Sequence, residues 1–232
     1  MDDRIPLLLL PGLLLDERLY KNLVDALGDM ATIQVADLTQ DDTIAGMAKR
    51  ALAAAPERFA LCGLSMGGYV ALEIMRLAPA RVERLALLNT QARPDAGEAR
   101  ERRLSLMDIA EQGRFDDAVA QLLRLFVHED RLADEDLMGA LESMAQSVGK
   151  DAFLRQQSAI MSRIDSRPSL AAINCPTMVL GGRQDALMPP HLHEELAAAI
   201  PNAALIILPH CGHLSPLEQP VAVTTQLRAW LA

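Results

Sequence analysis

Apolar runs and helical stretches alternate along this chain of 232 residues. Ile5–Leu10 is continuously apolar, which is typical of a strand buried on both faces. Leucines recur every four residues at Leu19, Leu23 and Leu27, which predicts a helix over 18–27. The same reasoning predicts strands at 32–36, 59–62, 84–89, 177–181 and 204–208, and helices at 43–54, 66–77, 190–199 and 216–231. Because strands alternate with helices, we expect an α/β protein with a mostly parallel sheet of about six strands flanked by helices.

The segment 91–172 breaks this alternation. It contains no convincing strand, and its apolar residues recur at spacings of three and four, as at Val119, Leu122 and Phe126. This pattern predicts three or four helices inserted between two strands of the sheet. We therefore expect a core domain formed by 1–90 and 173–232, and a helical cap, or lid, formed by 91–172.

The most informative motif is Gly63-Leu64-Ser65-Met66-Gly67, which joins the predicted strand 59–62 to the predicted helix 66–77. A serine on such a sharp turn exposes its hydroxyl at the edge of the sheet, and the turn leaves little room for side chains on either side. The following helix directs its free N–H groups toward the same point. Ser65 is therefore the candidate nucleophile, and an ordinary glycine-rich loop is the alternative.

A serine hydroxyl needs a base beside it and an acid that orients the base. Asp185 follows the predicted strand 177–181, and His213 follows the predicted strand 204–208. The carboxyl ends of parallel strands share one edge of a sheet, so we expect Ser65, Asp185 and His213 to converge as nucleophile, acid and base. Three other residues are rival candidates for the base and the acid: His210, Asp37 and Asp165.

The remaining histidines are not expected in this site. His128 is expected to be a solvated residue of the cap. His191 and His193 are two positions apart on a predicted helix and so face different directions, which argues against a pair of metal ligands.

The oxyanion formed by attack on a carbonyl needs two N–H donors. The N–H of Met66, directly after Ser65, is the first candidate. The N–H of Leu13 is the second, because the loop after the first strand reaches the same edge. In that loop Pro11 has no N–H to give and Gly12 lets the chain turn. The alternative is that Pro11-Gly12 forms only a turn.

Three segments resemble the α/β-hydrolase superfamily: Gly63-Leu64-Ser65-Met66-Gly67-Gly68, Gly182-Arg183-Gln184-Asp185 with Pro189, and Gly212-His213 with Pro216-Leu217-Glu218-Gln219-Pro220. The chain looks most like the small, cap-bearing esterase and acyl-hydrolase branch. That resemblance implies a helical lid over Ser65, and neither a metal nor an organic cofactor. The chain departs from the family at Pro11-Gly12, where members often carry His-Gly.

Composition narrows the classes of partner. The net charge is −9 and no basic stripe stands out, which argues against binding to nucleic acid or to an anionic membrane surface. Three cysteines without a C-x-x-C pair fit a reducing compartment: Cys62, Cys175 and Cys211. Acidic residues precede the N-terminal leucines, and Pro11-Gly12 interrupts this apolar stretch of leucines. We therefore expect a cytoplasmic protein with neither a signal peptide nor a membrane span.

These residues predict a serine hydrolase, similar to a carboxylesterase, that cleaves a small carboxylic ester through an acyl-enzyme on Ser65. A thioesterase or a hydrolase of carbon–carbon bonds would use the same three residues, and a receptor of low turnover could share the fold. The segment 91–172 supplies apolar residues, some of which are expected to line a pocket above Ser65: Leu122, Phe126, Leu141 and Phe153. The alternative is that they pack only among their own helices and leave a small polar pocket.

Overall fold

A single parallel sheet organises the fold. The computed structural model describes residues 4–95 and 97–232, and within them six strands lie in the order β2-β1-β3-β4-β5-β6. Every neighbouring pair is parallel. The strands are β1 (Ile5–Leu10), β2 (Ala31–Val35), β3 (Phe59–Leu64), β4 (Val82–Leu88), β5 (Thr177–Gly182) and β6 (Ala204–Leu208). The predicted fold class, a parallel sheet of about six strands flanked by helices, is confirmed.

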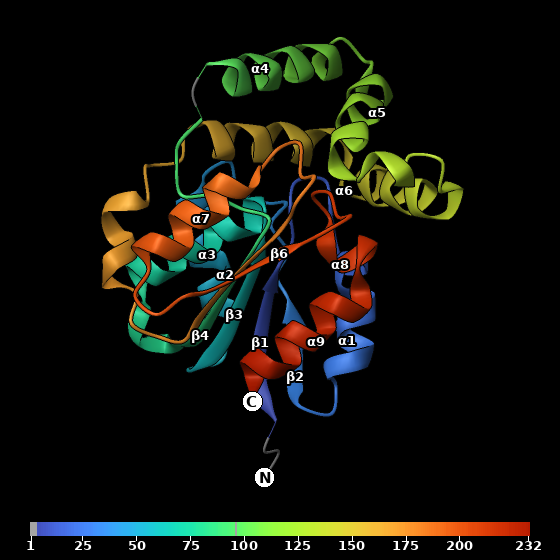
Figure 1. Ribbon diagram of the computed structural model, residues 1–232. Coiled ribbons are helices and arrows are strands. Elements are labelled where there is room, and N and C mark those ends of the chain that lie inside the picture. Colours follow the sequence, from blue (N-terminus) through green and yellow to red (C-terminus); the bar gives the residue numbers. More distant parts are fainter. Residues whose placement is uncertain (1–3, 96) are drawn as a thin grey trace.

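Helices lie on both sides of this sheet (Figure 1). α1 (Lys21–Leu27) packs against α9 (Pro220–Leu231), and α2 (Ile44–Ala54) packs against α3 (Met66–Leu77). α7 (Pro190–Ala199) packs on β5 and β6. Because both faces are covered, the central strands β3 and β5 are buried along their whole length, whereas β2 at the edge is mostly half-buried.

Two predicted helices differ from the helices of the structure. The predicted helix 216–231 is two helices, α8 (Ser215–Glu218) and α9, because Pro220 starts a new helix. The predicted helix 18–27 begins as a 3₁₀ turn over Glu17–Tyr20 and continues as α1. Short 3₁₀ turns also occur at Pro79–Arg81, Glu129–Arg131 and Arg167–Ala172.

Three helices separate β4 from β5 in the chain: α4 (Glu98–Glu111), α5 (Phe115–Phe126) and α6 (Glu135–Met161). We call them the inserted helices. The helical path of α6 is interrupted at Gly149, where φ is 79°, so the prediction of three or four helices is confirmed. The division into a core domain and a cap domain stays a prediction. In Figure 1 the inserted helices lie at the end of the molecule opposite the two termini.

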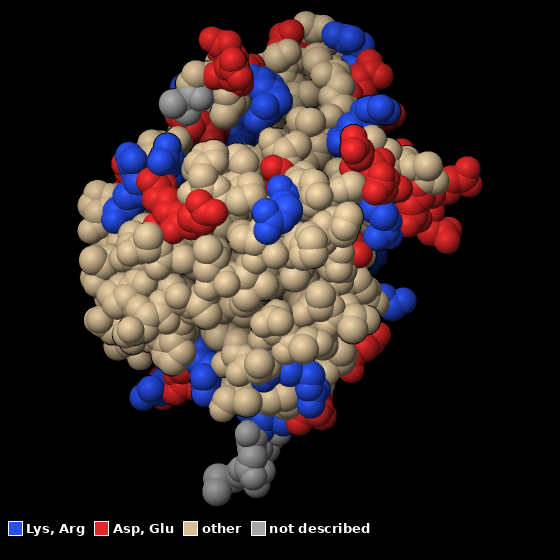
Figure 2. All heavy atoms as spheres, viewed as in Figure 1, with Lys and Arg blue, Asp and Glu red and all other residues tan. Residues whose placement is uncertain are grey.

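Charge is unevenly distributed over the face shown in Figure 2. Lys, Arg, Asp and Glu gather over the inserted helices, over α7 and near the termini, whereas few of them lie over β6 and the adjoining part of α9. Among the described residues, no helix combines the length and the apolar character that crossing a membrane requires.

Candidate active site

Ser65 occupies the single position between β3 and α3. Its backbone has φ 54° and ψ −115°, and its N–H donates to the carbonyl of Leu88 at 3.0 Å. A Cβ atom on Gly63 would collide with the backbone of Gly67, and a Cβ atom on Gly67 would collide with the carbonyl of Leu10. The glycines on either side of Ser65 are therefore needed for the close approach of backbone to backbone.

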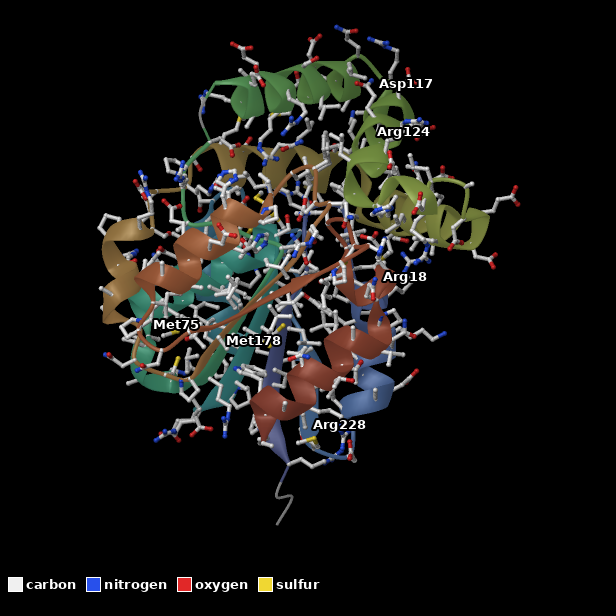
Figure 3. All side chains as sticks on the ribbon, viewed as in Figure 1. Arg18, Met75, Asp117, Arg124, Met178 and Arg228 are labelled. Carbon is white, nitrogen blue, oxygen red and sulfur yellow. The ribbon has the colours of Figure 1, made fainter. Side chains whose placement is uncertain are left out.

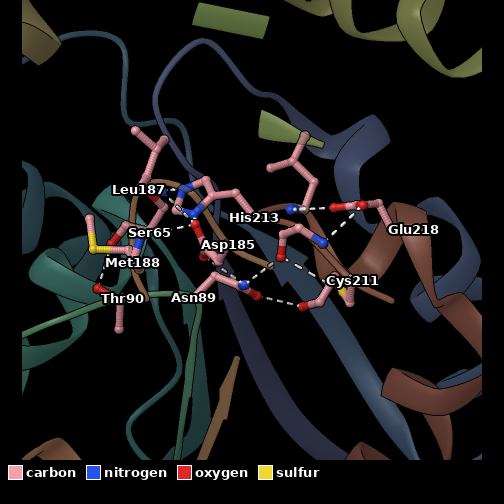
Figure 4. A network of polar contacts seen from close by, with 12 residues as sticks. Ser65, Asn89, Thr90, Asp185, Leu187, Met188, Cys211, His213 and Glu218 are labelled. Atoms are coloured by element: carbon pink, nitrogen blue, oxygen red, sulfur yellow. Dashed lines mark hydrogen bonds and ion pairs between the residues drawn. The ribbon is translucent and has the colours of Figure 1, made fainter. Parts of the chain in front are cut away.

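Ser65, His213 and Asp185 come together at the carboxyl edge of the sheet. The Nε2 atom of His213 is 2.8 Å from the Oγ of Ser65. The Nδ1 atom of the same ring is 2.8 Å from the Oδ2 of Asp185 (Figure 4). Ser65 is partly exposed, whereas His213 and Asp185 are 1% and 3% exposed. The spacing is that of a nucleophile, a base and an orienting acid.

Besides the His213 ring, three donors hold the carboxylate of Asp185. Its Oδ2 accepts from the side-chain amide of Asn89 at 3.0 Å, and its Oδ1 accepts from the backbone N–H groups of Leu187 and Met188 at 2.9 Å each. Burial alone would raise the pKa of Asp185, but the His213 ring and these hydrogen bonds outweigh burial and lower it. Asp185 therefore stays ionised and can stabilise a charged His213.

Asn89 was missed in the sequence reasoning. Besides Asp185, its amide nitrogen donates to the carbonyl of Gly212 at 3.1 Å, and its oxygen accepts from the hydroxyl of Ser215 at 2.6 Å. It is fully buried and links the acid to the loop that carries His213. Its place directly after β4, beside the strand that leads to Ser65, is the signal that could have identified it.

Glu218 was quoted for its place in a motif but not given a role. Its buried carboxylate accepts from the N–H groups of Gly212 at 3.0 Å, Leu214 at 3.0 Å and His128 at 2.7 Å. The first two donors flank His213, and the third follows α5. Glu218 thus fixes the His213 loop and ties it to the inserted segment. The expectation that His128 is solvated was wrong, because the residue is buried.

None of the rival residues bonds with Ser65. His210 is exposed, with its ring 6.3 Å from the ring of His128. Asp37 accepts hydrogen bonds from Thr39, and Asp165 pairs with Arg167. Over the described parts of the chain, no cluster of three or more His, Cys, Asp or Glu side chains could hold a metal ion.

The two candidate oxyanion donors lie next to Ser65. Met66 is the first residue of α3, and a Cβ atom on Gly12 would lie 3.5 Å from the Cβ of Ser65, so the loop of Leu13 runs beside the nucleophile. Neither the Met66 N–H nor the Leu13 N–H donates to another described group. The next N–H, that of Leu14, donates instead to the Oε1 of Gln156 in α6 at 3.1 Å.

A cavity of about 50 Å³ lies above Ser65. Leu122 and Phe126 line it, as predicted. Leu141 and Phe153 do not line this cavity; both are fully buried, and the Phe153 ring packs 5.7 Å from the ring of Phe115. A larger hollow of about 560 Å³ lies beside the ends of β1 and β2 and does not include Ser65.

The inserted helices also touch the candidate base. The N–H of His213 donates to the carbonyl of Phe126 at 3.1 Å, and the two rings are 5.7 Å apart. The space around the Ser65 hydroxyl is therefore bounded by the sheet edge on one side and by the end of α5 on the other.

Known proteins share both the sequence pattern and the fold. RutD of Pseudomonas savastanoi pv. phaseolicola, named as a candidate carbamate hydrolase, is 31% identical over 80% of this chain and 74% of its own length. Pimeloyl-[acyl-carrier protein] methyl ester esterase of Nitrosomonas europaea is 27% identical over 71% of this chain and 68% of its own. A thermophilic esterase from Thermogutta terrifontis, solved with malate bound, is 30% identical with a TM-score of 0.88, covering 98% of this chain and 89% of that one.

A sequence model of the Alpha/beta hydrolase family matches residues 8–226, which include β2 to β6 and every residue of the candidate site. The match agrees with the parallel sheet and with the sharp turn at Ser65. This chain is a member of the alpha/beta hydrolase family.

Proposed function

We propose that this protein is a serine hydrolase that cleaves a small carboxylic ester through an acyl-enzyme on Ser65. The observation that carries the proposal is the unbroken line of contacts from the Ser65 hydroxyl to His213 and from His213 to Asp185, each 2.8 Å long. Two of the relatives are esterases by name, which supports ester cleavage over the other reactions open to this family.

In the proposed reaction His213 takes the proton of Ser65 as the hydroxyl oxygen attacks the ester carbonyl. The charged ring is stabilised by Asp185, whose pKa is lowered and which therefore remains an anion. The tetrahedral intermediate collapses when His213 passes the proton to the departing alcohol. A water molecule then attacks the acyl group, giving its proton to His213, and Ser65 recovers a proton as the acid leaves.

The negative charge on the carbonyl oxygen is held by the N–H groups of Met66 and Leu13. Their lack of any other described acceptor supports this role. Because the donors belong to the backbone, they are fixed before the substrate arrives, and such preorganised donors are worth roughly 10²–10³-fold in rate each.

Labelling with a fluorophosphonate probe tests the proposal. We expect one modified residue, Ser65, and no labelling of Ser65→Ala. Labelling that persists in Ser65→Ala would contradict the assignment.

Substrate panels separate the related functions. Nitrophenyl esters, matching thioesters and a ketone with a cleavable carbon–carbon bond are compared with the Ser65→Ala protein as the blank. We expect esters to be turned over repeatedly. A single burst equal to the enzyme concentration with no steady turnover would favour the receptor alternative.

A further inference from the structure

The cavity above Ser65 contains a hydrogen-bond donor that the protein itself leaves unused. Tyr69 lies one helical turn beyond Ser65 on α3 and lines the cavity. The residue is 3% exposed, and its buried hydroxyl finds no hydrogen-bond partner among the described residues. Buried hydroxyl groups are nearly always paired, so an unpaired one that lines a cavity beside a nucleophile points to an acceptor on a ligand.

The ring of Tyr69 is held in place. The guanidinium of Arg163 lies over it, 4.2 Å from the ring centroid. Arg163 donates to the carbonyls of Arg93 and Ile160 at 3.0 and 2.8 Å and to the carboxylate of Asp95 at 2.7 Å. A cation stacked on a phenol also makes its O–H a stronger donor, because it withdraws electron density from the ring.

The cavity is positively charged, although the chain as a whole carries −9. Asp95 is the only carboxylate among the described residues that line it, and Arg103 and Arg163 both pair with that carboxylate. One negative charge is thus shared by two guanidinium groups. Arg102, from α4, adds a further charge. Arg102 is exposed, and its side chain forms no hydrogen bond or ion pair with any described residue.

We propose that this cavity selects esters that carry a second, anionic group, with Arg102 and the Tyr69 hydroxyl binding a carboxylate while Ser65 attacks the ester. This rests on the proposed function of Ser65. The substrate class is the half-ester of a short dicarboxylic acid. The small cavity, about 50 Å³, favours a short chain between the two carbonyl groups. Bidentate pairing with a carboxylate suits a guanidinium, and the phenol supplies a third donor.

The first experiment compares monoethyl succinate with ethyl succinamate, which has the same shape but no charge. We expect wild type to favour the anionic ester in kcat/KM by about ten- to a hundred-fold, the range that one charge-assisted hydrogen bond supplies. In Arg102→Gln that ratio is expected to fall toward one. Arg124→Gln is the matched control, since Arg124 is exposed on the outer side of α5 and does not line the cavity (Figure 3). An equal ratio in wild type and Arg102→Gln would overturn the inference.

The second experiment uses Tyr69→Phe, which removes only the unpaired hydroxyl. We expect kcat/KM for monoethyl succinate to fall about tenfold while the melting temperature stays the same or rises, because no bond within the protein is lost. A lower melting temperature with unchanged kinetics would mean that the hydroxyl serves the fold, and the inference would fail.

The third experiment separates this inference from the proposed reaction. Calorimetry with succinate on Ser65→Ala measures the anion site without any hydrolysis. Succinate binding by Ser65→Ala that is lost in the double variant Ser65→Ala/Arg102→Gln supports the anion site even if no ester is cleaved. Efficient cleavage of both esters without preference, together with no succinate binding, overturns the anion site and leaves Ser65 as the nucleophile.

Discussion

The sheet edge and the inserted helices both contribute to the candidate site, and they are built differently. At the sheet edge, Asp185 and the loop of His213 are fixed by backbone N–H groups and buried side chains. Beside the inserted helices, the groups near the cavity are held by ion pairs between side chains, centred on Asp95 in the segment before α4. At the sheet edge the donors belong to the backbone and are placed by the fold itself, whereas in a pair of side chains both partners can change while the helices remain.

This difference indicates that the two regions have different roles in the proposed reaction. The sheet edge supplies Ser65, His213 and Asp185, which the proposed reaction needs for every substrate. The inserted helices supply Arg102, whose contact with the substrate depends on what the substrate carries. Two buried carboxylates, Asp185 at the sheet edge and Asp95 beside the inserted helices, allow this difference to be tested directly.

Asp185→Asn tests the sheet edge and has the largest expected effect. The amide can no longer stabilise a charged His213 or hold its tautomer, so we expect kcat to fall by about 10⁴-fold. The free energy of unfolding should change far less than kcat, because the amide oxygen can still accept from Leu187 and Met188. Ester hydrolysis and urea unfolding measure the two quantities. Activity near that of wild type would contradict the proposed role of Asp185 and the difference between the two regions.

Asp95→Ala tests the ion pairs beside the inserted helices. It leaves the guanidinium of Arg163, which is 4% exposed, buried without its carboxylate. Loss of one partner of a buried ion pair destabilises by about 3–5 kcal/mol. We expect this loss in urea unfolding, with the Arg58–Glu83 pair as a control, since Arg58→Gln removes an ion pair whose side chains are 67% and 40% exposed and should change stability by less than about 1 kcal/mol. Equal losses from both variants would contradict the prediction.

His193, on α7 beside the sheet, makes the free energy of unfolding depend on pH. Burial lowers its pKa to about 4, while in the unfolded chain the ring titrates at its ordinary value, near 6.5. As the pH falls through this window the unfolded chain binds the proton first, so stability is full above 6.5 and declines below it. We expect a loss of roughly 2 kcal/mol between pH 7 and pH 5 from this group. Urea unfolding of His193→Leu should show a shallower pH dependence, and an unchanged one would refute the assignment.

Gln156 links the two regions and has the smallest expected effect. From α6 it accepts from the N–H of Leu14 and donates to the carbonyl of Leu38 at 3.2 Å, beside the proposed oxyanion donor Leu13. Gln156→Leu should lower stability by about 1–2 kcal/mol and kcat by about tenfold, because the loop loses its buried partner. Gln146→Leu, on the exposed side of the same helix, is the control. Equal effects of the two variants would show that Gln156 does not hold the loop.

The sheet edge was predictable because its signals are local. The turn at Ser65 needs glycine on both sides, and Asp185 and His213 each follow an apolar strand. Pro220 also marked the start of α9, but the apolar pattern continued across it and predicted one helix. The place of Asn89 after β4 could have located it at the sheet edge, but the partners of Asn89 and Glu218 could not be predicted, because their hydrogen bonds join residues distant in the chain or depend on how a loop folds back.

The inserted helices were harder to predict for a physical reason. Their apolar spacing located helices, yet the same spacing serves residues that face the cavity, such as Leu122, and residues that face a neighbouring helix, such as Phe153. Which face meets the cavity depends on how the helices cross, and periodicity does not determine that crossing. The pairing of Asp95 with two arginines likewise depends on contacts across the chain.

The backbone of Ser65 has a consequence for how such a protein evolves. With φ at 54° and ψ at −115°, the residue occupies a conformation that destabilises a side-chain-bearing residue by about 1–3 kcal/mol and that glycine adopts freely. Selection for stability alone would therefore place glycine at position 65. Under the proposed function, this strained position keeps a serine because the reaction needs its hydroxyl, although glycine would make the fold more stable.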